Sequence, residues 1–337
     1  MSKVLQVRNL TTQLSIEGKT YTVVDNLSFD IERGEILALV GESGCGKSMT
    51  ALSILRILPQ PPALFPKGEV IFRGYNLMTL SESEMSRIRG YSIAMIFQDP
   101  MSALNPVYSI GEQLREVAAR HLEIEKEAIE ERIIKVLEDV RLPNPKERMR
   151  EYPHQMSGGM LQRVMIAMAL IGSPDLLIAD EATTALDVTI QAQILDLLKE
   201  LQQKKEMSIL MITHNMGVVA EIADRVIVMY AGEQIEQAQV EHLFENPAHP
   251  YTQALLSAHP NSSLMIGRWP TISGNVPKVT DLPQGCSFHP RCHYQMNMCT
   301  SGKVPFFPLP EKEHQAKCWL YDKKLKWKLA NEEVIDD

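Results

Sequence analysis

The chain has 337 residues, of which 45% are hydrophobic, and its formal net charge is −8 at pH 7. This length suits about two domains, and an acidic chain is a poor candidate for broad nucleic-acid binding, which usually needs a basic face. No run approaches the roughly 18 apolar residues of a membrane span, and residues 1–20 lack the apolar segment of a signal peptide. The sequence therefore predicts a globular, cytoplasmic protein that reaches a membrane only through partners.

Two kinds of strand pattern occur along the chain. Alternating apolar and polar residues predict antiparallel strands around 5–15, 21–31 and 69–72, whereas continuous apolar runs predict buried parallel strands at 35–40, 176–180 and 208–213. Helical patterns separate the parallel strands, so we expect an α/β fold. Between about 100 and 172 the strand signals disappear, and runs such as EIEKEAIEERIIKVLEDV (123–140) predict a helical subdomain. After about Pro260 the composition shifts, and we expect a domain boundary there.

A glycine-rich loop follows the first predicted parallel strand. The stretch LALVGESGCGKSMTALSILR (37–56) fits G-x-x-x-x-G-K-[ST] through Gly41, Gly46, Lys47 and Ser48, and it leads into a predicted helix. Backbone N–H groups would surround phosphate oxygens, Lys47 would reach the β- and γ-phosphates of a nucleotide, and Ser48 would bind Mg²⁺. The alternative is an ordinary turn between strand and helix. The same site is expected to include Ser43, Gly44, Cys45 and Met49.

A second motif lies at the end of a later parallel strand. The stretch DLLIADEATTALD (175–187) is an apolar strand that ends in Asp180 and Glu181. With a phosphate loop upstream, we expect Asp180 to hold Mg²⁺ and Glu181 to orient and polarise the attacking water. The alternative is an acidic strand end without a catalytic role.

Between these motifs lies SGGMLQR (157–163), and with it residues 1–258 closely resemble the ATP-binding subunits of ABC transporters. The resemblance implies a P-loop NTPase cassette with an antiparallel β subdomain, a RecA-like core and a helical subdomain at about 100–172. In that family the signature loop contacts the ATP of the facing cassette. Its glycines and helix start suit phosphate. The corresponding residues here are Ser157, Gly158, Gly159 and Gln162.

Four further positions receive roles from the resemblance. Gln98 (AMIFQDP) would contact Mg²⁺ or the attacking water, and its loop would contact the membrane subunit. His214 (SILMITH) would contact the γ-phosphate, so the catalytic set is Glu181, His214 and Gln98. Asp187 would link two cassettes. Tyr21 is the best candidate for stacking on adenine, and a core position on a strand is its alternative.

Two positions depart from the family pattern. Ala182 replaces the proline that usually follows the catalytic glutamate, and Asn215 replaces the aspartate that often follows the switch histidine. Neither change removes a group with a chemical role, so ATP hydrolysis is still expected. The turnover rate is left open, because loop geometry affects catalysis.

Four stretches narrow the resemblance to the peptide and nickel importer branch, above all to its dipeptide and oligopeptide members. They are FQDPMSALNPVYSIGEQL, YPHQMSGGMLQRVMIAMAL, VTIQAQILDLLKELQ and NPAHPYTQALLSAHP. The resemblance implies ATP-driven peptide import, with nickel import as the alternative. It also implies a second ABC ATPase subunit, expected to be a different chain, two transmembrane permease subunits and an external substrate-binding protein. The chain would lie peripherally at the cytoplasmic face of the inner membrane.

Two other classes of function fit the sequence less well. A soluble ABC ATPase acting on nucleic acid or the ribosome often carries a coiled-coil insertion or a second cassette, and the short stretch between Gln98 and Ser157 fits a transporter instead. A non-hydrolysing binding module would be expected to lack Glu181 or His214, and this chain has both.

The last segment, 259–337, holds four of the five cysteines. Cys286, Cys292, Cys299 and Cys318 form a C-x5-C-x6-C-x18-C array. A cytosolic location disfavours disulfides, and four thiolates suit either Zn²⁺ or a 4Fe-4S cluster. The lack of a close C-x2-C pair is unlike most zinc ribbons, and the peptide-importer family can carry an iron-sulfur cluster on a similar array. Free thiols are the third possibility. Cys45 is expected to fill space, although a helix start can lower the pKa of a thiol.

Overall fold

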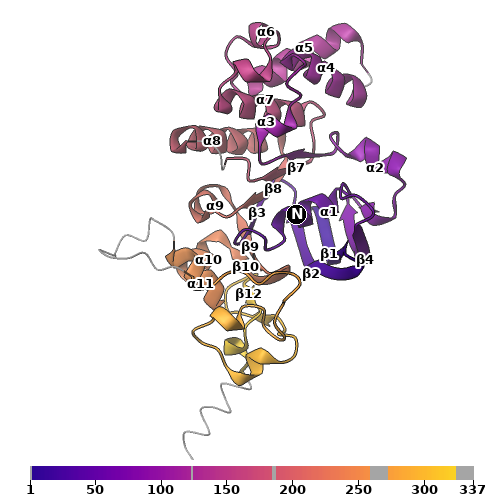
Figure 1. The fold of residues 1–337 in the computed structure, drawn as a ribbon. Helices are drawn as coiled ribbons and strands as arrows, with labels where there is room; N and C mark the ends of the chain where they lie inside the picture. Colours follow the sequence, from indigo (N-terminus) through magenta and orange to yellow (C-terminus); the bar gives the residue numbers. More distant parts are fainter. Residues whose placement is uncertain (1, 123, 184–186, 259–271, 324–337) are drawn as a thin grey trace, which may run out of the picture.

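The computed structural model of the chain describes residues 2–122, 124–183, 187–258 and 272–323. Parts of the predicted C-terminal extension, 259–271 and 324–337, lie outside the described residues. Within the described part, a four-stranded antiparallel sheet lies beside an eight-stranded sheet. In Figure 1 a group of helices forms the upper part, the antiparallel sheet lies at the right, and the C-terminal region, in orange and yellow, forms the lower part.

The antiparallel sheet has the strand order β2-β1-β4-β5. Its long strands are amphipathic. Their apolar side chains share one core cluster with α1 and with one face of the central sheet. Leu5 of β1 pairs with Ile31 of β2 and with Phe72 of β4, and all three are buried. The strands are longer than predicted, because apolar and polar residues do not alternate clearly at their polar ends. Their bounds are β1 (Lys3–Ile16), β2 (Lys19–Glu32), β4 (Ala63–Phe72) and β5 (Tyr75–Asn76).

The central sheet has the order β11-β12-β10-β9-β3-β8-β7-β6. Five strands are parallel and fully apolar or nearly so, as buried parallel strands must be: β3 (Ile36–Val40), β6 (Ile93–Ile96), β7 (Leu176–Asp180), β8 (Ser208–Thr213) and β9 (Arg225–Tyr230). Three strands at one edge are antiparallel: β10 (Glu233–Gln239), β11 (Phe307–Pro308) and β12 (Gln315–Ala316). The α/β fold with its additional antiparallel sheet is confirmed.

Helices pack on the central sheet, and a group of them forms a helical region above it in Figure 1. The helices between the phosphate loop and the helical region are α1 (Lys47–Ile54), η1 (Leu77–Thr79) and α2 (Glu82–Ile88). The helical region contains α3 (Pro100–Ala103), α4 (Ile110–His121), α5 (Lys126–Asp139), α6 (Pro145–Arg148), η2 (Pro153–Gln155) and α7 (Gly158–Leu170). Apolar residues of α4, α5 and α7 share one core with β7 and with α8 (Val188–Lys205). The helical region is therefore packed onto the sheet through α7 and α8.

The remaining helices lie toward the C-terminal region. They are α9 (Met216–Ile222), α10 (Val240–Glu245), α11 (Pro250–Ser257), η3 (His289–Arg291), η4 (Asn297–Thr300) and η5 (Trp319–Tyr321). No helix among the described residues is both long and apolar enough to cross a bilayer.

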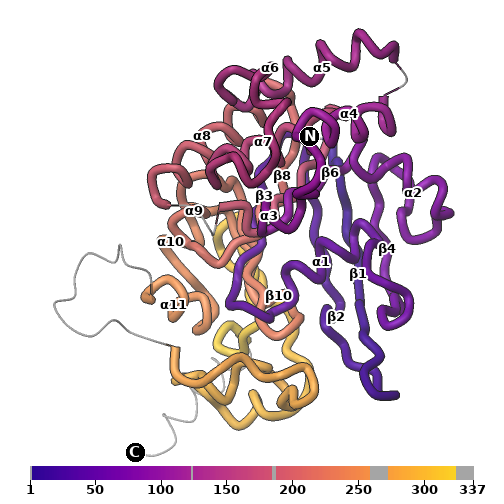
Figure 2. The backbone as a smooth tube through the Cα atoms, turned by 45° about the horizontal axis from the view of Figure 1, so that its top comes forward, coloured from indigo at the N-terminus to yellow at the C-terminus, as the bar shows by residue number. Residues whose placement is uncertain are grey.

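The C-terminal region continues the central sheet. Ala316 of β12 pairs with Glu236 of β10, and Phe288 shares a core cluster with Tyr230 and Tyr251. Figure 2 shows the yellow C-terminal tube against the end of the molecule that carries β10 and α11. The predicted boundary near Pro260 is thus crossed by strand pairing and by a shared core. The 1–258 and 259–337 division itself stays a prediction.

Candidate active site

The phosphate loop joins β3 to α1. Lys47, only 5% exposed, donates from Nζ to the carbonyl oxygens of Gly41 at 2.8 Å and of Glu42 at 3.1 Å. The backbone of Gly46 has φ +103°, and a Cβ there would lie 2.8 Å from the carbonyl oxygen of Val23. Only glycine fits this backbone without displacing β2. The loop therefore holds a buried cation at the start of a helix, which suits phosphate.

A cavity of about 670 Å³ opens in front of this loop. It contains most of the predicted phosphate-site residues together with Gln98 and Glu181. Its other walls come from β2, from the turn after β9 and from the C-terminal region. The lining residues are Thr22, Val23, Ser43, Gly44, Gly46, Lys47, Ser48, Met49, Gln98, Glu181, Ala231, Gly232, 276–280 and Leu282.

Ser48 and Asp180 meet at the floor of the site. The Ser48 hydroxyl donates to Asp180 Oδ1 at 3.0 Å, which joins the start of α1 to the end of β7. Burial raises the pKa of Asp180, and the Ser48 hydrogen bond opposes this effect only in part. A buried carboxylate beside a hydroxyl is an oxygen donor set that Mg²⁺ prefers. The two residues that the sequence assigned to Mg²⁺ are thus in contact.

Glu181 connects the two other residues of the predicted catalytic set. Gln98 Nε2 donates to Glu181 Oε2 at 2.8 Å, and His214 Nδ1 lies 3.1 Å from Glu181 Oε1. The Glu181 backbone has φ +48°, in the left-handed region that residues with a Cβ seldom adopt. Its N–H donates to the carbonyl oxygen of Ile212 at 2.9 Å, which holds this turn against β8. Three residues distant in sequence therefore converge beside the phosphate loop.

The signature loop lies at the start of α7 and is separate from the phosphate-loop cavity. Ser157 is the N-cap of α7, its Oγ accepting from the Met160 N–H at 3.4 Å, and Ser157 and Gly158 are exposed. Gly159 packs toward α8, where a Cβ would lie 2.9 Å from Ile190 Cγ2. Neither Ser157 nor its glycines line the cavity around Lys47. Their surface position leaves them free to meet a second molecule.

Three predicted site residues, Gln162, Tyr21 and Cys45, do not line the cavity around Lys47. Gln162 is 1% exposed, so its side chain lies inside the helical region and cannot reach a facing nucleotide. Tyr21 is half-buried on β2, and its neighbours Thr22 and Val23 line the cavity in its place. Cys45 is fully buried, and burial raises the pKa of its thiol, opposite to the effect of a helix start. The role of Cys45 is therefore to fill space.

The remaining loop residues act as helix caps. The Asp187 carboxylate caps α8 by accepting from the Ile190 N–H at 2.9 Å, and the side chain is exposed. Asn215 caps α9 by accepting from the Gly217 N–H at 2.9 Å. Asparagine and aspartate cap helices about equally well, so replacement of the usual aspartate keeps the geometry after His214. Ala182 is buried at the position of the usual proline.

The four C-terminal cysteines line one small cavity together with His249 and Phe288. All are free thiols, and burial raises the pKa of Cys286 to about 11 and that of Cys318 to about 12. Nevertheless, no three His, Cys, Asp or Glu side chains among the described residues are grouped closely enough to hold a metal ion. A tetrahedral zinc site would place its sulfurs roughly 3.8 Å apart, since Zn–S is about 2.3 Å. The four thiols line one cavity, but in the described part of the chain they do not form a closed zinc site.

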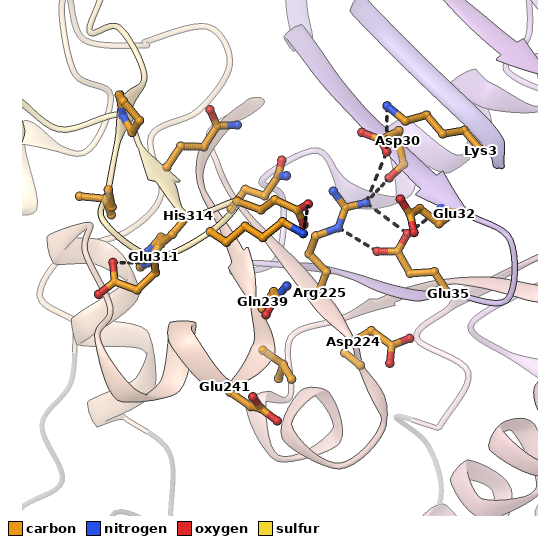
Figure 3. Close-up of a pocket in the computed structure, with 18 of the residues that line it drawn as sticks. Lys3, Asp30, Glu32, Glu35, Asp224, Arg225, Gln239, Glu241, Glu311 and His314 are labelled. Atoms are coloured by element: carbon orange, nitrogen blue, oxygen red, sulfur yellow. Dashed lines mark hydrogen bonds and ion pairs between the residues drawn. The ribbon is translucent and has the colours of Figure 1, made fainter. Parts of the chain in front are cut away.

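A larger cavity, of about 940 Å³, lies between β1 and β2 on one side and the β11–β12 hairpin on the other. Figure 3 shows several of its charged side chains paired with one another. Arg225 Nε donates to Glu35 Oε1 at 2.8 Å, and Lys3 Nζ lies 3.4 Å from Asp30 Oδ2. None of the described residues that line it belongs to the phosphate loop or to the Asp180-Glu181 motif. We therefore place the candidate active site at the smaller cavity.

Comparisons with known families match two parts of the chain. Residues 24–184 match the family described as ABC transporter. Residues 235–299 match the family described as oligopeptide/dipeptide transporter, C-terminal region. The second match begins within β10 and includes three of the four C-terminal cysteines.

Curated relatives and solved structures agree with these matches. The dipeptide transport ATP-binding protein DppD of Bacillus subtilis is 47% identical over 324 residues, which cover 96% of each chain. The oligopeptide transport ATP-binding protein OppD of the same organism is 46% identical, over 95% of this chain and 89% of that protein. A dimeric post-hydrolysis structure of the ATP-binding cassette MJ0796, bound to ADP and Pi, is 26% identical with a TM-score of 0.62, over 70% of this chain and 98% of that one. CbiO1 of Clostridium perfringens aligns with a TM-score of 0.63 at 26% identity, over 73% of this chain and 92% of that one.

Proposed function

Because the chain belongs to the ABC transporter family of ATP-binding proteins and carries the oligopeptide/dipeptide transporter C-terminal region, we propose that it hydrolyses ATP to drive peptide import. The observation that carries this proposal is that Lys47, Ser48, Gln98 and Glu181 line one cavity, with Asp180 hydrogen-bonded to Ser48. A binding module without hydrolysis would have no need of Glu181 beside the phosphate loop. Relatives named for dipeptide, oligopeptide and peptide transport favour peptides over nickel.

The residues in and beside the cavity are assigned separate roles in binding and hydrolysis. Lys47 and the N–H groups of the loop bind the phosphates, and Ser48 with Asp180 holds Mg²⁺. Glu181 accepts a hydrogen bond from the attacking water and places its oxygen in line, while Gln98 and His214 fix the carboxylate. Bound MgATP supplies the phosphoanhydride bond that is cleaved. Release of phosphate then removes the charge that His214 faces.

A reconstituted transporter tests this proposal. The chain is combined in vesicles with its permease and second ATPase subunits and the external binding protein, and uptake of radiolabelled dipeptide, oligopeptide and Ni²⁺ is measured with and without ATP. We expect ATP-dependent peptide uptake that Lys47→Ala abolishes. Uptake of Ni²⁺ alone would establish the nickel alternative, and uptake unaffected by Lys47→Ala would contradict the proposed role.

The assembly we propose is a heterodimer of two different ATPase subunits on two permeases, at the cytoplasmic face of the membrane. Its support is the exposed position of Ser157, Gly158 and Asp187, away from the cavity around Lys47. Such residues would complete the nucleotide site of a facing cassette. The signature loop of the second subunit would complete the nucleotide site of this chain in return.

For the cysteine cavity we propose a 4Fe-4S cluster in preference to zinc. The support is that Cys286, Cys292, Cys299 and Cys318 all line one cavity, as the four ligands of one cluster must. A cluster binds each thiolate to a different iron, so its sulfurs lie farther apart than those around one zinc ion. Buried thiols of raised pKa must lose protons on loading.

Anaerobic purification decides between the three possibilities for these cysteines. We expect brown protein with equal amounts of iron and acid-labile sulfide, and loss of the colour in Cys292→Ser. Cys45→Ser is the matched control, since Cys45 lies in the phosphate loop, and it should keep the colour. Colourless protein with about one zinc per chain, or with no metal at all, would overturn the cluster.

A further inference from the structure

One wall of the phosphate-loop cavity comes from the C-terminal region. Residues 276–280 and Leu282 line the cavity together with Ser43, Lys47 and Ser48. Val276, Pro277, Val279 and Leu282 make this wall largely apolar. Lys47 would bind the phosphates, and an apolar wall of the same cavity suits the base and ribose of a nucleotide.

Arg291 joins this wall segment to the phosphate loop. Its Nε donates to the carbonyl oxygen of Ser273 at 2.8 Å, at the start of the wall segment. Its Nη1 and Nη2 donate to the two carboxylate oxygens of Glu42, at 2.7 and 3.1 Å. Glu42 is the second residue of the phosphate loop, so one guanidinium connects this loop to the C-terminal wall segment.

Burial and further contacts hold the Arg291 guanidinium and the Glu42 backbone in place. The Arg291 side chain is 5% exposed, its Nη1 also donates to Tyr230 Oη at 3.2 Å, and its guanidinium lies over the Tyr230 and Phe288 rings. The Glu42 N–H donates to Tyr251 Oη at 2.8 Å, which holds the backbone as well. Buried two-pronged arginine–carboxylate contacts are strong and directional.

Glu42 passes this constraint to the phosphate-binding lysine. Its carbonyl oxygen accepts from Lys47 Nζ at 3.1 Å, and that of the preceding Gly41 accepts at 2.8 Å. A shift of Glu42 therefore moves the oxygens that orient the Lys47 ammonium group. Arg291 touches neither the cavity nor the reacting atoms, so it would act through Glu42.

We propose that Arg291 is a positioning residue of the ATP site, and that the C-terminal wall segment which it holds, 272–282, contributes directly to binding the nucleoside part of ATP. This inference rests on the proposed function, since it presupposes that the cavity binds ATP. It makes the C-terminal region a part of the nucleotide site. It also predicts that changes at Arg291 affect binding of the phosphates of ATP, whereas changes in the wall segment affect binding of its nucleoside.

Equilibrium titration of the full chain with ATP and with inorganic tripolyphosphate tests both parts. Arg291→Gln should weaken binding of both ligands about tenfold, because it disturbs the phosphate loop. Arg291→Lys, which keeps the charge but loses the fork, should recover only part of this loss. Leu282→Ala should weaken ATP severalfold and leave tripolyphosphate unchanged. Adding Glu42→Gln to Arg291→Gln should cause little further loss, since the two residues act through one contact.

The matched control is Lys303→Gln, which removes another ion pair between the C-terminal region and β2, Lys303–Asp25 at 3.2 Å. It should change neither affinity. Circular dichroism melting checks folding, and if Arg291→Gln fails to fold, Glu42→Gln tests the same contact from its more exposed side. Unchanged ATP affinity in Arg291→Gln would overturn the positioning role, and equal losses of both ligands in Leu282→Ala would overturn the wall. Failure of the unaltered chain to bind ATP would instead overturn the proposed function.

Discussion

Glu181 adopts a left-handed backbone directly after β7, and this conformation turns its carboxylate toward Gln98 and His214. A non-glycine residue in this region costs of order 1 kcal/mol or more and persists where the surrounding structure holds it. The hydrogen bond from its N–H to Ile212 provides that hold. The strained turn therefore places the proposed base of the reaction.

Replacing Glu181 by glutamine should separate binding from chemistry. Glu181→Gln keeps the shape of the side chain but loses the carboxylate that accepts from water, so ATP affinity should persist while turnover falls at least about a hundredfold. Titration and phosphate release assays measure the two quantities. Glu221→Gln, on exposed α9 surface, is the control. Near-normal turnover of the Glu181→Gln variant would remove Glu181 from its role.

His249 should make the stability of the chain depend on pH. Burial lowers the pKa of His249 to about 4, from an ordinary value of 6.5. Between these values the unfolded chain binds a proton that the folded chain does not, so the free energy of unfolding should fall as pH drops from 6.5 toward 4, by up to about 3 kcal/mol. Urea unfolding at several pH values measures this slope.

The control for this slope is His249→Asn. The His249 Nδ1 accepts from the Tyr251 N–H at 3.0 Å as the N-cap of α11, and asparagine is a good cap that does not titrate. The variant should therefore show a shallower loss of stability between pH 6.5 and 4. An identical slope in both proteins would assign the effect to other groups.

The motif residues of the active site could be predicted from sequence, because their spacing reflects fixed chemistry at strand ends. Lys47, Ser48, Gln98, Asp180, Glu181 and His214 come together as motifs of this kind require. The Arg291–Glu42 contact joins residues 249 positions apart, and no spacing pattern in the sequence relates the two. Burial of Gln162 could not be foreseen either, since polar residues seldom lie inside a helical core.

At the scale of elements, Glu236 on β10 is the link between the cassette and the C-terminal region. Its fully buried carboxylate accepts from the N–H groups of Ala248 and His249 at 2.7 and 2.8 Å, and lies 2.8 Å from His314 Nε2. One side chain therefore fixes the start of α11 and the loop before β12. Buried acceptors of this kind are costly to remove, because their donors remain without partners.

Glu236→Ala should loosen both attached elements. We expect a loss of about 3 kcal/mol or more in the free energy of unfolding, and faster hydrogen exchange at α11 and β12. His314→Ala added to Glu236→Ala should cost less than it does alone, because the two side chains share one contact. Lys312→Ala, on the exposed part of the same loop, should be neutral. Additive losses in the double variant would argue against the link.

The elements of the sheet differ in how far the sequence reveals them. Continuous apolar runs predict β3, β7 and β8 with nearly the observed bounds. β10 contains charged and amide residues that are nonetheless buried, Glu236 among them. Its sequence therefore lacks the apolar run that would predict a buried strand. β11 and β12 have two residues each, which is too short for any periodicity. Their pairing with β10 depends on contacts that local patterns do not contain.

At the scale of the whole molecule, the exposed signature loop predicts nucleotide-dependent pairing. Mixed with its second ATPase subunit and ATP, the Glu181→Gln chain should form a heterodimer, because trapped ATP would bridge Lys47 of one cassette and the Ser157 loop of the other. Light scattering after size exclusion measures the mass. Ser157→Arg should prevent pairing by crowding the γ-phosphate position. A stable homodimer that restores transport without a second ATPase subunit would contradict the preference for two different chains.

The β11–β12 hairpin covers the edge of β10. An uncovered strand presents a row of free N–H and C=O groups to which a strand of another molecule can add. A chain shortened at the end of α11 would lose this hairpin and would present an open edge on its central sheet. Aggregation of such a fragment would reflect the uncovered edge of β10, to which strands of other molecules could add.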